Sequence, residues 1–227
     1  MLERLKNGII VSCQPVVGGP MDKPEIIAAY AQAALDGGTT ALRIEGLANL
    51  AAVRAVTKAP IIGLVKRDLA QSDVRITPLV EDVVALAERG ADIIAVDVTS
   101  RPRPVAIAEL FAEIKRQDRL IMADCATIDD ARAASGSGAD ILGTTLSGYL
   151  GGPVPSEPDF DLLAALPALN RFVVAEGRYQ RPHQVARAVS LGADAVVVGS
   201  AVTRPEHITS WFVDAMARPN ATEAGYG

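Results

Sequence analysis

Short apolar runs alternate with longer amphipathic stretches along the whole chain. The runs are nearly continuous in Val, Ile, Leu and Ala, which is typical of strands buried on both faces of a parallel sheet. Eight runs predict β-strands, at residues 9–14, 41–45, 61–66, 93–99, 120–125, 141–145, 172–176 and 195–199. The stretches between and after them predict helices near residues 24–36, 48–57, 78–89, 104–117, 128–137, 159–167, 181–191 and 206–217.

A repeated phrase marks several of the helix-to-strand junctions. Gly-Ala-Asp occurs at residues 90–92, 138–140 and 192–194, each time after an Ala-rich amphipathic stretch and before a β-branched run, and residues 37–42 form a looser copy. Glycine suits the position just after a helix, where φ is positive, so each phrase predicts a helix end, a tight turn and the next strand. The repetition indicates one supersecondary unit used several times.

Eight strand–helix units within 227 residues predict a single (β/α)8 TIM barrel, an α/β fold that takes residues 1–227 as one domain. A doubly wound sheet usually has fewer strands and a glycine-rich dinucleotide turn, and the sequence has no G-x-G-x-x-G motif. We expect a short disordered tail from about residue 219.

Nearly every predicted strand is apolar until its last residues and then becomes charged or hydroxylic. These polar strand ends are Gln14, Arg43, Glu45, Lys66, Arg67, Asp68, Asp97, Thr99, Asp124, Thr144, Thr145, Glu176, Arg178, Gly199 and Ser200. In a parallel barrel the carboxyl ends of the strands meet at one mouth, where barrel enzymes have their active sites. A single strand-end Asp is often a helix cap, but so many polar ends at one mouth indicate catalysis.

The third strand ends in two adjacent cations, Lys66 and Arg67. Side chains alternate along a strand, so these two point in opposite directions and only one enters the barrel. Alternation favours Lys66 only weakly and leaves the reverse arrangement open.

The ends of the last two strands are suited to a phosphate. Gly177 and Gly199 offer backbone N–H groups, and Arg178, Ser200 and Arg204 offer side-chain donors. Barrel enzymes commonly bind phosphate at this position. Thr203, three residues before Glu206, also fits a helix capping box, a purely structural role.

Composition narrows the function further. Hydrophobic residues make up 49% of the chain and aromatic residues 4%, so the core must be aliphatic. The net charge of −5 and the lack of a Lys/Arg run argue against nucleic-acid binding. No apolar stretch approaches the roughly 20 residues that span a bilayer, and no signal peptide is visible, so we expect no membrane association and a cytoplasmic enzyme.

Residue types that are scarce exclude some chemistry. Cys13 and Cys125 are too few for a disulfide framework and fit reduced core thiols. His183 and His207 both fall in predicted helices, away from the expected mouth, and no cluster has metal-ligand spacing. We therefore expect no metal and no cofactor, which leaves lysine and carboxylates to move protons.

The chain resembles the N-acetylmannosamine-6-phosphate 2-epimerase family. The motifs that carry the resemblance are Ser12-Cys13-Gln14-Pro15, Leu42-Arg43-Ile44-Glu45-Gly46, Gly63-Leu64-Val65-Lys66-Arg67-Asp68, Met122-Ala123-Asp124-Cys125, Gly143-Thr144-Thr145-Leu146-Ser147-Gly148-Tyr149, Ala175-Glu176-Gly177-Arg178 and Val198-Gly199-Ser200-Ala201-Val202-Thr203-Arg204-Pro205. They follow one another in order over nearly the whole chain. Leu69, where an aromatic residue is expected, and Cys125 are small departures that leave the chemistry unchanged.

The resemblance implies an isomerase that interconverts N-acetyl-D-mannosamine 6-phosphate and N-acetyl-D-glucosamine 6-phosphate in sialic acid and amino-sugar breakdown, without metal or nucleotide. It makes Lys66 the base for the C2 proton and Glu176 its partner. Its implied substrate contacts are Gln14, Arg43 and Asp124 for the sugar oxygens, and Gly177, Arg178, Gly199, Ser200 and Arg204 for the phosphate. A homodimer is compatible with the sequence.

The implied reaction raises a question about charge. A lysine base must be neutral, and lowering its pKa from about 10.4 to 7–8 requires roughly 4 kcal/mol of preference for the free amine. Burial and Arg43 lower that pKa, whereas an ionised Glu176 raises it, so the two groups should titrate jointly.

Three other functions remain open. A Lys66 Schiff-base aldolase would use the same lysine as a nucleophile. A metal-dependent pentulose-phosphate epimerase lacks the His ligands it needs, and a barrel that only binds a sugar phosphate would not need both Lys66 and Glu176.

Overall fold

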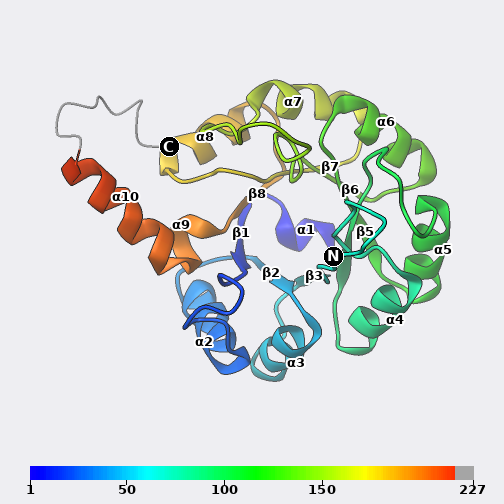
Figure 1. Ribbon diagram of the computed structural model, residues 1–227. Coiled ribbons are helices and arrows are strands. Elements are labelled where there is room, and N and C mark those ends of the chain that lie inside the picture. The colour runs from blue at the N-terminus through cyan, green and yellow to red at the C-terminus, as the bar shows by residue number, and fades with distance from the viewer. Residues whose placement is uncertain (218–227) are drawn as a thin grey trace.

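The computed structural model describes residues 1–217 and contains a closed barrel of eight parallel strands (Figure 1). The strands are β1 (Gly8–Cys13), β2 (Ala41–Glu45), β3 (Ile61–Leu64), β4 (Ile93–Asp97), β5 (Leu120–Asp124), β6 (Ile141–Gly143), β7 (Phe172–Ala175) and β8 (Ala195–Val198). Pairing of β8 with β1 closes the sheet. The predicted (β/α)8 barrel and its eight strands are confirmed, and the tail expected from about residue 219 lies outside the described residues.

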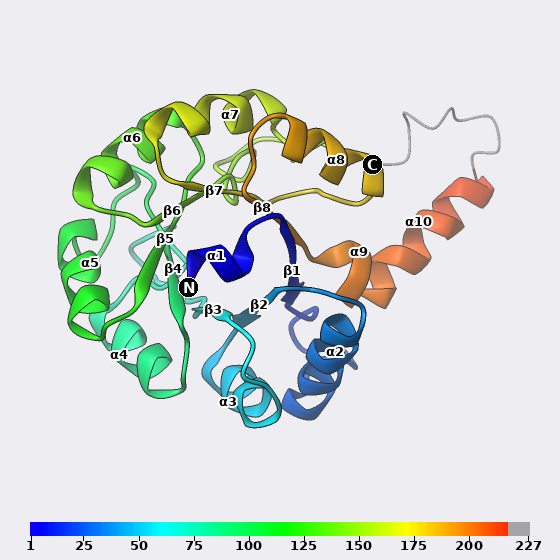
Figure 2. The same cartoon turned by 180° about the vertical axis from the view of Figure 1, so that it is seen from behind.

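Helices surround the barrel and also cover one of its ends. The outer helices are α2 (Pro24–Asp36), α3 (Leu47–Val56), α4 (Val80–Glu88), α5 (Ile107–Arg116), α6 (Ile128–Ser137), α7 (Phe160–Ala165) with the 3-10 helix η1 (Leu166–Leu169), and α8 (Pro182–Ser190). The short α1 (Leu2–Leu5) lies across the end where the strands begin, as the rear view in Figure 2 shows, and its Leu5 is fully buried. The opposite end, where the strands finish, is free for a site.

The Gly-Ala-Asp repeat has a physical explanation in hydrogen bonds. Its glycines have φ of 88° at Gly90, 95° at Gly138 and 97° at Gly192, the positive values predicted from the sequence. Its aspartates each accept a hydrogen bond from the first or second amide of the preceding strand, at 2.8–2.9 Å: Asp92 from Ile61, Asp140 from Ile121 and Asp194 from Val173. Each repeat therefore turns the chain and fixes the start of a neighbouring strand.

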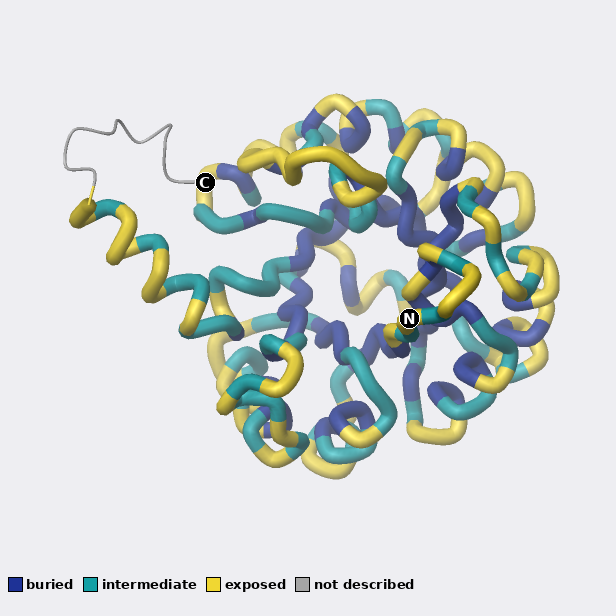
Figure 3. Tube along the Cα trace, viewed as in Figure 1, coloured by how far each residue is buried: buried dark blue, intermediate teal, exposed yellow. Residues whose placement is uncertain are grey.

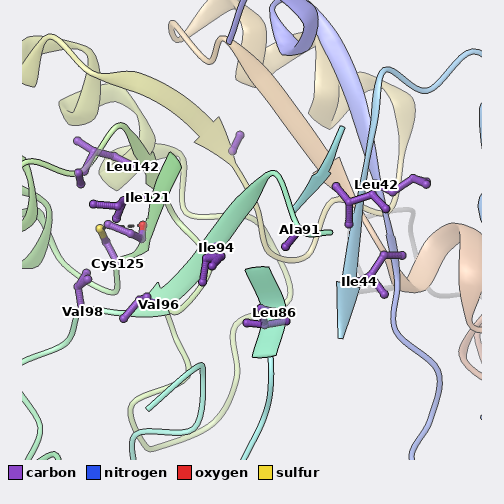
Figure 4. Packing of buried hydrophobic residues seen from close by; sticks show 14 of the residues in the cluster. Leu42, Ile44, Leu86, Ala91, Ile94, Val96, Val98, Ile121, Cys125 and Leu142 are labelled. Carbon is purple, nitrogen blue, oxygen red and sulfur yellow. Dashed lines mark hydrogen bonds between the residues drawn. The ribbon is translucent and has the colours of Figure 1, made fainter. Parts of the chain in front are cut away.

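Alternate residues of the strands build two apolar layers. Ile62 and Leu64 of β3 point into the barrel, where they pack with side chains from the other strands. Ile61 and Val65 belong to the outer layer between sheet and helices, part of which Figure 4 shows. Gly63 makes room there, because a Cβ at this position would lie 2.8 Å from the Cβ of Ala91.

The last helix departs from the ring. After the short α9 (Ser200–Thr203), α10 (Pro205–Ala217) projects away from the barrel and has no buried residue (Figures 1 and 3). The sequence predicts this helix at residues 206–217 but gives no sign that it leaves the barrel wall. Within residues 1–217, no helix combines the length and apolar character needed to cross a membrane.

Candidate active site

A pocket of about 750 Å³ opens at the carboxyl ends of the strands. Nine of the ten predicted site residues line it: Gln14, Arg43, Lys66, Glu176, Gly177, Arg178, Gly199, Ser200 and Arg204. The tenth, Asp124, is fully buried beneath the floor and reaches the pocket through its contact with Arg43. The structure thus gathers residues from β1, β2, β3, β7, β8 and the loops that follow them.

Arg43 organises the floor of the pocket. Its side chain is only 1% exposed, and its two terminal nitrogens donate to the two carboxylate oxygens of Asp124 at 3.3 and 2.7 Å. Its Nε lies 3.1 Å from Oε1 of Glu176, as an ion pair without hydrogen-bond geometry. Removing one member of such a buried pair typically costs about 3–5 kcal/mol, because the remaining charge is left without its partner.

Glu176 is also held from β6. Thr145 donates from Oγ1 to Oε2 of Glu176 at 3.2 Å and lies 2.6 Å from Oδ1 of Asp124. The Thr144 hydroxyl accepts from the backbone N–H of Glu176 and donates to its carbonyl. These three contacts and the ion pair with Arg43 fix both the backbone and the carboxyl group of Glu176.

Burial raises the pKa of Glu176 to about 7, and the nearby Asp124 carboxylate adds to this effect. Arg43, the Thr145 hydroxyl and Lys66 oppose it without cancelling it. A carboxyl group with this pKa is half protonated near neutrality, so it can both accept and donate a proton.

Lys66 lies within the pocket, with its Nζ 2.6 Å from Oε1 of Gln14. The Lys66 side chain is exposed to the open pocket, but desolvation by the surrounding protein lowers its pKa, with further lowering by Arg43 and Arg204, while Glu45 and Glu176 act in the opposite direction. The lysine follows Ile62 and Leu64 on the inward face of β3, which explains its direction.

Arg67 points to the outside of the barrel. Its guanidinium donates to both carboxylate oxygens of Asp82 on α4, from Nε at 2.8 and 2.9 Å. Of the two cations left open by strand alternation, Lys66 is the one in the pocket.

Gly199 and its neighbours form a close junction with β1. A Cβ on Gly199 would lie 3.3 Å from the Cβ of Ser12. Arg204 donates from Nε to the carbonyl oxygen of Gln14 at 2.8 Å, and Thr203 donates to the carbonyl oxygen of Ser12 at 2.8 Å. Thr203 therefore ties α9, which follows β8, to β1, and the suggested capping box with Glu206 is wrong because α10 begins at Pro205.

Arg178 holds the loop that follows β6. It donates from Nε to the carbonyl oxygen of Glu157 at 2.7 Å and from Nη1 to that of Ser147 at 2.6 Å. Its guanidinium also lies 5.4 Å from the ring centre of Tyr149. Arg178 has a φ of +64°, which is unusual for a residue other than glycine. Its side-chain contacts therefore hold a strained backbone conformation in place.

The sequence reasoning missed part of the pocket wall. His207 and Trp211 of α10 line the pocket, so the expectation that His207 lies away from the mouth is wrong. Their spacing of four residues puts both on one helix face, a signal that the sequence contains. Asp73 and Arg75 also line the pocket, from a segment that bends back so that Ile76 bridges Lys66.

Comparison with protein-family models places residues 27–218 in a family described as putative N-acetylmannosamine-6-phosphate epimerase. A putative N-acetylmannosamine-6-phosphate 2-epimerase of Actinobacillus pleuropneumoniae is 55% identical over 214 residues, which cover 94% of this chain and 93% of that protein. A bifunctional enzyme NanE/NanK of Brucella melitensis is 55% identical over 225 residues, 97% of this chain. The chain spans only 43% of the length of that bifunctional relative.

Solved structures give a consistent result. The N-acetylmannosamine-6-phosphate 2-epimerase from Clostridium perfringens superposes with a TM-score of 0.91 at 37% identity, covering 94% of this chain and 95% of that one. A thiamine phosphate pyrophosphorylase from Pyrococcus furiosus has a TM-score of 0.61 at 19% identity, a likeness of fold alone.

Proposed function

Because the chain belongs to the N-acetylmannosamine-6-phosphate epimerase family, we propose that it interconverts N-acetyl-D-mannosamine 6-phosphate and N-acetyl-D-glucosamine 6-phosphate. The reaction removes the C2 proton from the open-chain sugar and returns one to the opposite face. The observation that carries the proposal is the joint presence of Lys66, Arg43 and Glu176 in one pocket. The activity would serve amino-sugar and sialic acid breakdown, and the enzyme would act in the cytoplasm.

Lys66 is the proposed base. Desolvation and the cations Arg43 and Arg204 favour its neutral form, and the hydrogen bond to Gln14 holds its nitrogen in position. An amine that donates one N–H to Gln14 keeps its lone pair for the C2 proton. The C2 proton is acidic because it is adjacent to the C1 aldehyde, and the resulting enolate places negative charge on O1.

Arg43 supplies the positive charge that this enolate needs. Its guanidinium is already fixed by Asp124, so little reorganisation is required when charge develops on O1. Asp124 would then act on the substrate through Arg43, which refines the direct oxygen contact implied by the family resemblance.

Glu176 is the proposed second proton carrier. Its pKa of about 7 lets it exchange a proton with the intermediate or with Lys66, so that one site serves both faces of C2. No step of this scheme uses a metal or a cofactor.

The phosphate would bind at the part of the pocket formed by the ends of β7 and β8. Gly177, Gly199, Ser200 and Arg204 line this part and offer N–H, hydroxyl and guanidinium donors. Arg178 lines it too, although two of its N–H groups already bind loop carbonyls.

A homodimer is the proposed assembly. Phe212, Val213 and Met216 of α10 are 71%, 61% and 84% exposed, an unusual apolar face for an isolated chain. A second copy covering this face would bury it. Phe212→Asp should then shift the protein to monomer in sedimentation experiments, whereas Val17→Asp, at another exposed valine, should not. A wild-type monomer at micromolar concentration would contradict the proposal.

The activity is tested by proton NMR of N-acetylmannosamine 6-phosphate with the enzyme in D2O. We expect deuterium at C2 together with the appearance of N-acetylglucosamine 6-phosphate. Absence of both exchange and product would refute the function. Borohydride reduction in the presence of substrate should leave Lys66 unmodified, since a Schiff-base aldolase would trap it.

A further inference from the structure

One segment of the pocket wall has no part in the proposed proton transfer or phosphate binding. The loop between β6 and α7 contributes Leu146, Tyr149, Val154 and Pro155 to the lining. Tyr149 is 46% and Val154 54% exposed, so this wall presents apolar surface to the open pocket. The ends of β7 and β8 contribute mainly polar groups, with Tyr179 and Val197 as the apolar exceptions.

We propose that this loop is the recognition wall for the N-acyl group of the substrate, and that Arg178 positions it. The inference rests on the proposed function, since it assigns the group attached to C2. The methyl of the acetamido group is the only apolar end of the sugar phosphate; every other substituent is a hydroxyl, a carbonyl or the phosphate. A run of apolar side chains on one loop, exposed to the pocket, fits that methyl.

The position of the loop supports the assignment. Thr145 donates to the carboxylate of Glu176, and the loop begins at the next residue, Leu146. Glu176 is proposed to act at C2, and the acyl nitrogen is bonded directly to C2. The acyl group must therefore lie close to the start of this loop, while the phosphate is four carbons further along the substrate chain.

The loop is fixed at its base and folds back on itself. Arg178 joins its two ends by donating to the carbonyls of Ser147 and Glu157. The Glu157 carboxylate also accepts from the Gln184 side chain at 2.8 Å. Pro155 packs against Gly148, where a Cβ would lie only 2.6 Å from the proline Cδ. These contacts bring Tyr149 and Val154 to one side of the pocket and set its width.

Arg178 is thus a positioning residue for the wall. A lysine there would keep a positive charge near the phosphate but could not donate to both carbonyls in the same fixed geometry. This difference separates the positioning role from phosphate binding.

The test compares kcat/KM for N-acetyl, N-propanoyl and N-butanoyl mannosamine 6-phosphate. Val154→Ala should lower the preference for acetyl over butanoyl by about tenfold, the usual effect of a methylene or two in an apolar pocket. Leu150→Ala is the matched control, because Leu150 is in the same loop and 45% exposed but is not among the residues lining the pocket. It should leave the preference unchanged.

Arg178→Lys should reduce the same preference and raise KM while kcat stays within about threefold, and inhibition by inorganic phosphate should change little. A preference that is identical in wild type, Val154→Ala and Arg178→Lys would overturn the inference. Loss of phosphate inhibition in Arg178→Lys with intact acyl preference would make Arg178 a phosphate ligand instead. If the wild type gives no C2 exchange with the acetyl substrate, the proposed function itself fails.

Discussion

Replacing Glu176 by glutamine should change how the stability of the fold depends on pH. The pKa of Glu176 is raised from 4.5 to about 7 in the folded protein, chiefly by burial. Below pH 4.5 both folded and unfolded states carry the proton. Between pH 4.5 and 7 the unfolded state loses it while the folded state keeps it, so stability falls as the pH rises. Above pH 7 the loss is complete.

The size of this loss follows from the shift in pKa. At 1.36 kcal/mol for each pH unit, the rise from 4.5 to about 7 corresponds to about 3 kcal/mol of destabilisation at alkaline pH. Glutamine has no proton to lose and removes this dependence. The free energy of unfolding of Glu176→Gln minus that of the wild type should therefore increase by about 3 kcal/mol between pH 4 and pH 8.

The measurement is urea unfolding of both proteins across that pH range at one protein concentration. Glu88→Gln, at an exposed position on α4, is the control and should follow the wild-type curve. A difference between Glu176→Gln and wild type that stays constant with pH would refute the assignment of a raised pKa to Glu176.

Three further substitutions test other parts of the structure. Lys66→Ala should reduce C2 deuterium exchange by at least about a hundredfold, the usual contribution of a general base, whereas Arg67→Lys, outside the barrel, should retain it. Gly63→Ala should lower the free energy of unfolding by about 1–3 kcal/mol, because its Cβ would meet that of Ala91 at 2.8 Å. Gly136→Ala, in α6 with nothing within 4 Å of a new Cβ, should instead raise it by about 0.5–1 kcal/mol. Equal effects of the two glycine substitutions in thermal unfolding would contradict this account.

The fold could be predicted because its signals are local. Each strand is an apolar run, and each Gly-Ala-Asp phrase contains both the glycine for the turn and the aspartate that bonds the preceding strand. The direction of Lys66 was harder to predict, because a strand buried on both faces is apolar on both. Only the packing of Ile62 and Leu64 inside the barrel identifies the inward face.

Two features of the site depend on tertiary structure that no local pattern reports. Asp124 ends β5 and Glu176 directly follows β7, yet only Asp124 lies beneath Arg43, where both terminal nitrogens of that arginine bind it. His207 belongs to a helix that could have packed on the outer wall, as α2 to α8 do. Because α10 leaves the barrel instead, its first turns border the pocket.

Catalysis needs a lowered pKa for Lys66, whereas an ionised Glu176 nearby would raise it. The raised pKa of the Glu176 carboxyl group resolves this conflict. An ionised Glu176 would raise the pKa of Lys66, but near pH 7 the carboxyl is protonated about half the time and then exerts no such effect. In that state the lysine can be neutral while the carboxyl holds a proton, which provides one base and one acid for the two faces of C2. Above pH 7 the carboxyl loses its proton and the acid disappears, even though a larger fraction of Lys66 becomes neutral. The decline of kcat/KM above pH 7 should therefore report the loss of the Glu176 proton, and it should be absent from the residual activity of Glu176→Gln.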